Sequence, residues 1–175
     1  MAAGCLPSLC FSANYFPSKY DTDIKSAQKM YLPGLPWQFV KAQLYQESRL
    51  NPNAVSPAGA RGIGQFMPGT WKEVSQRLGY GAIGPHEAGP AIHASAYYMA
   101  TLRQAWRRLQ DMERHKFALA SYNAGRGNVS RARRLAGNSG RWDKTADQLH
   151  KVTGRYSRET VTYVRRVFQW YGMMQ

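Results

Sequence analysis

Apolar residues recur at spacings of three and four along most of this chain, which is the period of an amphipathic α-helix. Between Pro36 and about Leu50, for example, Trp37, Val40 and Leu44 share one stripe, and the proline suits the first turn of a helix. Strand-type alternation of Thr or Val with polar residues is scarce. The sequence therefore predicts a mainly α-helical protein.

Segments rich in Gly, Pro and Asn separate the helical runs. "NPNAVSPAGARG" and "GYGAIGPHEAGP" are typical of turns and loops, and Gly125 is a usual helix terminator. After the first helix, we expect further helices over residues 68–78, 91–110, 116–123, 129–135, 142–149 and 159–171. Two of them are expected to bury the stripes Ile92, Ala96, Met99, Arg103 and Val161, Val164, Val167, Phe168.

The length of 175 residues, with 43% hydrophobic residues, is enough for one globular domain with a substantial core. Residues 1–36 lack sustained periodicity, so we expect an N-terminal arm or a short lead-in helix ("DIKSAQKMY") packed on a main domain of residues 37–175. Cys5 and Cys10 are close enough in sequence to close only a local loop, and their spacing is not that of a zinc site.

The charge is lopsided, with 24 Lys and Arg against 10 Asp and Glu, a net charge of +14. This excess favours a polyanionic partner such as nucleic acid, an anionic membrane or an anionic cell envelope. No ordered nucleic-acid motif accompanies "RQAWRR" or "RGNVSRARRLAGNSGR", so we expect no specific nucleic acid and prefer attraction to an anionic envelope. No apolar run is long enough to span a membrane, and the start lacks the features of a secretory signal.

The four histidines lack the spacing of a metal site such as H-E-x-x-H. We therefore expect no metal and no cofactor, and structural or surface roles for His86, His93, His115 and His150.

One carboxylate stands apart in "VKAQLYQESRL". Glu47 continues the apolar stripe of its helix, and no other acidic residue occurs between Asp23 and Glu73. Burying an ionised carboxylate is costly, so such a group keeps its proton and its pKa rises. A carboxylic acid that is still protonated near neutral pH can act as a general acid. Periodicity alone leaves open whether Glu47 is catalytic or belongs to a structural hydrogen-bond network.

Ordinary glycoside hydrolysis requires two carboxylates that flank the scissile bond. Glu73 falls in the first turn of the next expected helix, where an exposed acid is the usual finding. If Glu47 acts on sugars, its partner is therefore expected not to be a carboxylate.

Three ordered motifs, "ESRLNPNAVSPAGARGIGQFMPGTW", "ALASYNAG" and "ETVTYVRRV", resemble those of the soluble lytic transglycosylase (SLT) family of glycoside hydrolases. The resemblance runs from about Trp37 to Tyr171 and implies a lysozyme-like α fold, with several helices around a glycan-binding cleft. The family cleaves the β-1,4 bond between N-acetylmuramic acid and N-acetylglucosamine in peptidoglycan and leaves a 1,6-anhydromuramic end.

The resemblance also implies residue roles. Glu47 falls on the sole catalytic acid and base, and Ser48 on the serine that helps to place the muramoyl N-acetyl group. Gly62 and Gln65 are retained from the Gly-Leu-Met-Gln motif of the family. Gly64 stands where the family has Met, which is expected to shorten one wall of the cleft.

Later motifs supply the remaining residues. Tyr122 and Asn123 match residues that line the site, Tyr163 matches the tyrosine close to the catalytic glutamate, and Glu159 is expected to organise the fold. In the mechanism that the resemblance implies, Glu47 protonates the glycosidic oxygen and then accepts the proton of the muramoyl C6 hydroxyl. The N-acetyl group of the substrate replaces the second carboxylate. Without the resemblance, core packing is an equal explanation for the two tyrosines.

Three alternatives stay open for the whole chain. The first is the transglycosylase, expected as a monomer that acts on the wall from the periplasm or a virion. The missing signal indicates a phage-type lysin or virion-associated protein made in the host cytoplasm, or a chain without its leader. The second is a goose-type lysozyme that hydrolyses the bond with a second acid. The third is a basic scaffold that binds peptidoglycan or DNA without cutting.

Overall fold

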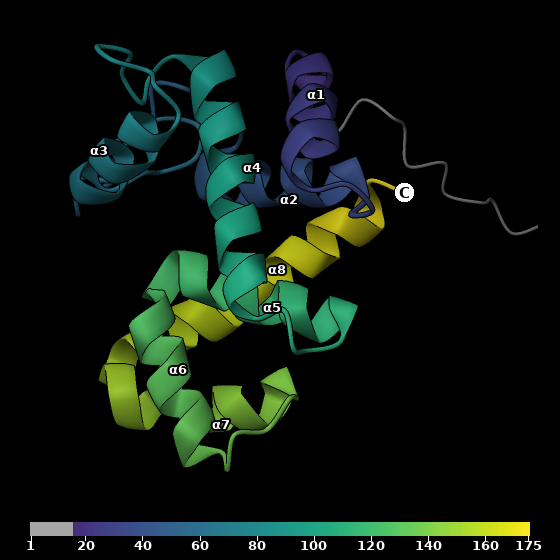
Figure 1. The fold of residues 1–175 in the computed structure, drawn as a ribbon, viewed down its shortest axis with the longest axis vertical. Helices are drawn as coiled ribbons and strands as arrows, with labels where there is room; N and C mark the ends of the chain where they lie inside the picture. The colour runs from purple at the N-terminus through teal and green to yellow at the C-terminus, as the bar shows by residue number, and fades with distance from the viewer. Residues whose placement is uncertain (1–15) are drawn as a thin grey trace, which may run out of the picture.

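The structure, a computed structural model, describes residues 16–175. Within this range the chain is mainly helical and contains no β-strand, as predicted (Figure 1). The α-helices are α1 (Asp21–Tyr31), α2 (Trp37–Ser48), α3 (Pro68–Arg77), α4 (Ala88–Ala105), α5 (Asp111–Ala124), α6 (Arg126–Leu135), α7 (Trp142–Thr153) and α8 (Ser157–Met173), and the 3-10 turn η1 (Gly154–Tyr156) joins α7 to α8. Helix ends differ from the predicted ranges by a turn or less in most cases, because polar terminal turns carry no apolar pattern.

The arrangement of the helices gives α8 a central position. In Figure 1, α4 runs beside α1 at one end of the molecule, and α6 and α7 lie together at the other end. Helix α8 crosses between the two ends and packs on α2, α5 and α7. As a result, side chains of α2, α5 and α8, which are far apart in sequence, face one another.

One hydrophobic core connects the helices. Its fully buried large side chains include Phe39 of α2, Phe117 of α5 and Leu149 of α7. His115 lies among them with 1% exposure, beside the rings of Phe39 and Phe168. Burial lowers the pKa of His115 to about 3, with a smaller contribution from the charge of Arg103, so this histidine is neutral in the folded protein.

The predicted stripes are not fully buried: Arg103 of α4 and Val161 and Phe168 of α8 are only half-buried. Thr160 and Tyr163 take inward positions of α8, because this helix faces both the core and a cleft. The guanidinium of Arg103 lies 2.5 Å from Asp111 at the start of α5, an ion pair that a helix edge permits and a core does not.

Helix α1 lies inside the segment predicted as an arm or lead-in helix. It packs on α4 and α2, and it buries Ile24 and Ala27 in the core. The buried Lys41 of α2 lies 2.6 Å from Asp21, which ties the start of α1 to α2. The domain boundary at residue 36 stays a prediction. Cys5 and Cys10 lie outside the described residues, and across residues 16–175 no helix is long and apolar enough to cross a membrane.

Candidate active site

A polar cleft of about 680 Å³ opens where the end of α2, the loop of residues 56–67, the end of α5 and one face of α8 meet. Five of the seven residues that the family resemblance places in the site line this cleft: Glu47, Gln65, Tyr122, Asn123 and Tyr163. Ser48 and Gly62 do not line it. The remaining lining residues are Gln46, Ser56, Ala58, Ala60, Met67, Arg158, Glu159, Thr162 and Arg166.

Glu47 lies in the last turn of α2 and faces the cleft. The Tyr163 hydroxyl donates a hydrogen bond of 2.5 Å to its Oε1. The side chain is half-buried, but protein surrounds the carboxyl, and this burial raises its pKa to about 8. The negative charge of Glu159 raises the pKa further, and the hydrogen bond from Tyr163 opposes the rise. Glu47 therefore holds a proton at neutral pH.

The end of α2 fixes the position of this carboxyl. The two residues after Ser48, Arg49 and Leu50, both adopt left-handed backbone angles, with φ of 57° and 62°. Such angles cost about 1–2 kcal/mol for a residue with a side chain. Burial of Leu50 and the stacking of the Arg49 guanidinium on the Trp170 ring, 4.8 Å from its centre, offset that cost. The helix consequently stops directly after Glu47 and Ser48.

Side-chain bonds stabilise the loop of residues 56–67, and one of them joins it to α2. The Gln65 amide donates to the carbonyl oxygens of Gly62 at 2.9 Å and Ala54 at 3.2 Å. Ser48 donates to the carbonyl of Ile63 at 2.9 Å. Ser48 thus adjoins Glu47 in sequence, but its hydroxyl joins α2 to the loop. Its predicted role toward an N-acetyl group stays a prediction.

Gly62 and Gly64 allow the loop to approach the rest of the protein closely. Gly62 has a φ of 75°, and a Cβ at this position would lie 1.8 Å from the backbone oxygen of Pro85. A Cβ at Gly64 would lie 2.2 Å from Ser95 Oγ of α4. A longer side chain at position 64 would therefore point at α4, and not into the cleft. Gly64 was expected to shorten a wall of the cleft. In the structure its role is instead to let the loop pack closely on α4.

The end of α5 supplies Tyr122 and Asn123. The Tyr122 hydroxyl donates to the carbonyl of Gly64 at 2.8 Å, and burial raises the pKa of this phenol well above its usual value. The Asn123 amide accepts a hydrogen bond of 2.7 Å from Thr160 and donates one of 3.3 Å to Glu159. Both side chains are held in fixed orientations, which makes them suited to contact a ligand.

Sequence reasoning missed the polar face of α8. Arg158, Glu159, Thr162 and Arg166 line the cleft beside Tyr163. The signal was present, since these residues follow the helical period, but only the apolar stripe, Tyr163 and Glu159 of this segment were given roles. Glu159, which was expected to organise the fold, both bonds Asn123 and places a second carboxylate in the cleft.

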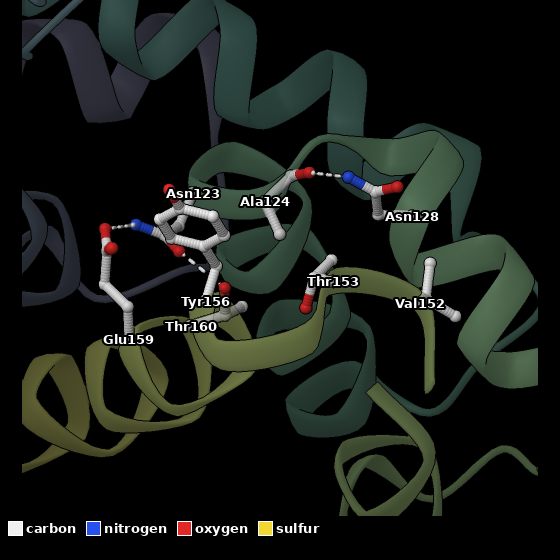
Figure 2. Close-up of a pocket in the computed structure, with 8 residues that line it drawn as sticks. All are labelled: Asn123, Ala124, Asn128, Val152, Thr153, Tyr156, Glu159 and Thr160. Carbon is white, nitrogen blue, oxygen red and sulfur yellow. Dashed lines mark hydrogen bonds between the residues drawn. The ribbon is translucent and has the colours of Figure 1, made fainter. Parts of the chain in front are cut away.

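A smaller pocket of about 340 Å³ adjoins the cleft. It shares Asn123 and Glu159 with the cleft, and Figure 2 shows the Glu159 carboxylate turned toward the Asn123 amide at one end of it. Its other lining residues are Ala124, Asn128, Val152, Thr153, Tyr156 and Thr160. Asn123 and Glu159 thus form a wall that both hollows share.

No group of three or more metal-ligating side chains occurs in the part of the chain that the structure describes. The histidines lie apart from one another: His86 contacts the carbonyl of Pro52, His93 packs on Tyr31, His115 is buried in the core and His150 contacts the carbonyl of Asp147. The arrangement in the cleft is instead that of a proton donor with polar neighbours.

The arrangement of helices around the cleft defines a lysozyme-like α-helical domain, and solved structures agree with this class. The 70 kDa soluble lytic transglycosylase from Escherichia coli matches with a TM-score of 0.68 at 25% identity, over 91% of this chain and 24% of that one. The lytic transglycosylase Slt of Pseudomonas aeruginosa, solved as an inactive mutant, matches with a TM-score of 0.71 at 23% identity, over the same shares of the two chains.

Sequence comparison defines the family. The model of the transglycosylase SLT domain matches residues 24–145, so this chain belongs to that family. A membrane-bound lytic murein transglycosylase F from Desulfosudis oleivorans is 32% identical in an alignment 158 residues long, which covers 81% of this chain and 34% of the relative. Its namesake from Saccharophagus degradans is 33% identical in an alignment 165 residues long, which covers 85% of this chain and 31% of the relative. The chain thus spans about a third of the length of these relatives.

Proposed function

We propose that this chain is a peptidoglycan lytic transglycosylase, which cleaves the β-1,4 bond between N-acetylmuramic acid and N-acetylglucosamine and forms 1,6-anhydromuramic acid. One observation carries the proposal: Glu47 is held in a polar cleft by Tyr163 at 2.5 Å, with a pKa raised to about 8. The names of the relatives, lytic murein transglycosylases, support it. Membership of the SLT family supports it as well.

In the proposed reaction, Glu47 acts first as an acid. Because Tyr163 donates to Oε1, the proton sits on Oε2, from which it passes to the glycosidic oxygen as the bond to C1 of the muramoyl unit breaks. Positive charge develops at C1, and the substrate's own N-acetyl group stabilises it. Asn123, whose amide retains one N–H beyond its bond to Glu159, is proposed to hold an N-acetyl group.

Glu47 acts next as a base. The carboxylate accepts the proton of the muramoyl C6 hydroxyl while that oxygen attacks C1, which closes the anhydro ring and returns Glu47 to its starting state. No water is consumed. Gln65 and Tyr122 are proposed to contact the sugars, and Ser48 and Gly62 to hold in place the loop that carries Gln65.

The test is mass spectrometry of the muropeptides that the protein releases from purified peptidoglycan. We expect anhydromuramic ends, and a loss of release of at least about 100-fold in Glu47→Gln. Glu73→Gln is the matched control, because Glu73 is an exposed acid of α3 that pairs with Arg77 outside the cleft. Release by Glu47→Gln at the rate of the parent protein would refute the proposal.

The goose-type hydrolysis is the second candidate, and Glu159 is the observation that favours it. This carboxylate lies in the same cleft as Glu47, where an inverting or retaining mechanism would need one. The product distinguishes the two reactions, because hydrolysis leaves a reducing muramic acid. A scaffold that only binds would release neither product.

We propose in addition that the basic surface attracts the protein to an anionic envelope. Exposed arginines follow α4 and continue along α6: Arg107, Arg108, Arg126, Arg131 and Arg134. Attraction of this kind weakens as salt screens the charges. Sedimentation with wall fragments at 50 and 500 mM salt tests it, and equal binding at both would contradict it.

A narrower proposal is that the chain is a monomeric, phage-type or virion-associated lysin. Its high basicity supports a lysin that disturbs envelopes as well as cutting glycan. Lysis of whole cells from outside, compared with lysis of purified walls, tests this proposal. Size-exclusion chromatography tests the monomer.

A further inference from the structure

The polar face of α8 carries a feature that glycan cleavage alone does not require. We propose that Arg158 and Arg166 form a binding site for the carboxylates that peptidoglycan bears on its muramoyl units, chiefly those of the peptide stem. The inference rests on the proposed function, because it takes a glycan strand as the occupant of the cleft.

Both arginines line the cleft and both are exposed. They are eight residues apart on one helix, which separates their backbones by about 12 Å along its axis. Neither guanidinium has a hydrogen bond, an ion pair or a ring contact within residues 16–175. Each of the two guanidinium groups therefore has its five N–H donors available to a ligand.

Other arginines of the protein are used differently. Arg103 pairs with Asp111 and Arg141 pairs with Asp143, while Arg133 donates to the carbonyl oxygens of the turn after α6. Arg49 lies over aromatic rings. The protein satisfies these guanidinium groups internally. Arg158 and Arg166 differ from them in having no such partner within the described residues, and they differ from other exposed arginines, such as Arg107, Arg108 and Arg134, in lining the cleft.

The carboxylates of the cleft do not account for the two arginines. Glu47 bonds Tyr163, and Glu159 accepts the amide of Asn123 rather than a guanidinium. Burial and the charge of Glu159 raise the pKa of Glu47, the hydrogen bond from Tyr163 lowers it, and no arginine is among these causes. Arg158 and Arg166 thus line the same cleft as these carboxylates without a bond to either of them.

The chemistry of the guanidinium identifies the ligand. A planar guanidinium binds a carboxylate through two parallel hydrogen bonds, and the hydroxyl and amide groups of the glycan backbone offer no such partner. Carboxylates occur on the lactyl ether of a bare muramic acid and on the peptide stem of a substituted one. Because two sites about 12 Å apart suit two separate carboxylates, the peptide stem is the favoured source.

The adjoining pocket provides a contrast. Its lining contains no Lys, Arg or His, and Figure 2 shows only neutral side chains around it apart from Glu159. A neutral sugar suits that pocket, whereas the two arginines make the cleft side of α8 selective for negative charge.

The experiment compares three substrates: peptidoglycan with intact stems, the same material after its carboxyls are converted to methylamides, and glycan stripped of stems by an amidase. The rate of release gives kcat/KM for each. Arg158→Gln/Arg166→Gln is expected to lower kcat/KM on intact material by about tenfold or more, mainly through KM, because each charge-assisted bond is lost. On the methylamide material the kcat/KM of this double variant should equal that of the parent protein.

The control is Arg165→Gln. Arg165 is exposed on the same helix, directly before Arg166, and does not line the cleft. The kcat/KM of this control variant should stay within about twofold of the parent value on all three substrates. Amidase-stripped glycan identifies the source: a loss by the double variant there assigns the lactyl carboxylate, and no loss assigns the stem.

Two results would overturn the inference while the proposed function stands: no loss on intact peptidoglycan, or an equal loss on intact and methylamide material. If the parent protein releases nothing from any substrate, the proposed function fails instead. The arginine site is then tested by measuring how much Glu47→Gln sediments with intact and with methylamide material. Binding that does not depend on the carboxyls, or on Arg158 and Arg166, would refute the site.

Discussion

Two groups of polar side chains in the cleft differ in how they are held. Glu47, Gln65, Tyr122 and Tyr163, which we call the fixed wall, each have a hydrogen bond to another part of the protein. Arg158, Thr162 and Arg166, the open wall, have none in the part of the chain that the structure describes.

The difference follows from what each wall must do. Proton transfer needs atoms that are already in place, because errors of a fraction of an ångström slow it. Binding a long, substituted glycan can use side chains that become ordered on contact. We therefore expect substitutions in or behind the fixed wall to change stability and kcat, and substitutions in the open wall to change KM.

The largest effect is expected behind the fixed wall. Gly62→Ala places a Cβ against the Pro85 backbone at a φ of 75°, so we expect a loss of at least about 3 kcal/mol in the free energy of unfolding. Thr162→Ala in the open wall should change it by less than about 0.5 kcal/mol. Urea unfolding measures both. Equal stabilities of the two variants would remove the distinction between the walls.

Glu47 itself is expected to destabilise the fold above acidic pH. Its pKa is about 8 in the folded protein against 4.5 in the reference state, so between these values the folded state binds one proton more than the unfolded state. Stability from this group is then present below pH 4.5 and is lost as the pH rises to about 8. At pH 8, Glu47→Gln should therefore unfold at a higher urea concentration than the parent protein, with a free energy of unfolding that is larger by about 1–3 kcal/mol. At pH 4 the two free energies of unfolding should be nearly equal. A variant less stable at pH 8 than its parent would contradict the buried, protonated carboxyl.

Tyr163→Phe removes the bond to Glu47 and leaves the ring. We expect kcat to fall by about 10- to 100-fold with KM nearly unchanged. Because this bond lowers the pKa of Glu47, the alkaline limb of the pH profile of kcat should move to higher pH. Tyr97→Phe is the control, since Tyr97 packs on Tyr31 outside the cleft. A change in KM alone would place Tyr163 in the open wall.

The smallest effect is expected for Glu159→Gln, which keeps an acceptor for Asn123 and removes a charge. That charge raises the pKa of Glu47, so the alkaline limb should move to lower pH, and kcat should change by less than about tenfold. If Glu159 is instead the second acid of a hydrolase, kcat falls by about 100-fold or more. The measurement therefore also separates the two reactions.

Much of the fold was predictable because its signals are local. The helix that carries Glu47 and the turn that follows it were predicted from spacing and turn residues, and α2 covers Trp37–Ser48. The stripe of α8 was wrong at Val161, because a helix that faces a core on one side and a cleft on another has two inward faces. A single periodic pattern does not distinguish between them.

The site was predictable in part for a different reason. The resemblance of three motifs named Glu47, Gln65, Tyr122, Asn123 and Tyr163, but the spacing of those residues in sequence says nothing about their distances. Arg158 directly precedes the third motif and Arg166 lies within it, but the resemblance gave neither a role, and both looked like ordinary charges of a basic helix.

By itself, the sequence determined that the chain is helical, that Glu47 lies in register with an apolar stripe, and that Gly62 and Gln65 follow in one loop. The tertiary structure alone decided that Tyr163, 116 residues away, reaches Glu47 at 2.5 Å. The reason is physical: helical periods are set by neighbours within two turns, whereas this contact depends on the packing of α2 against α8. That packing also turns the charged face of α8 into a wall of the cleft.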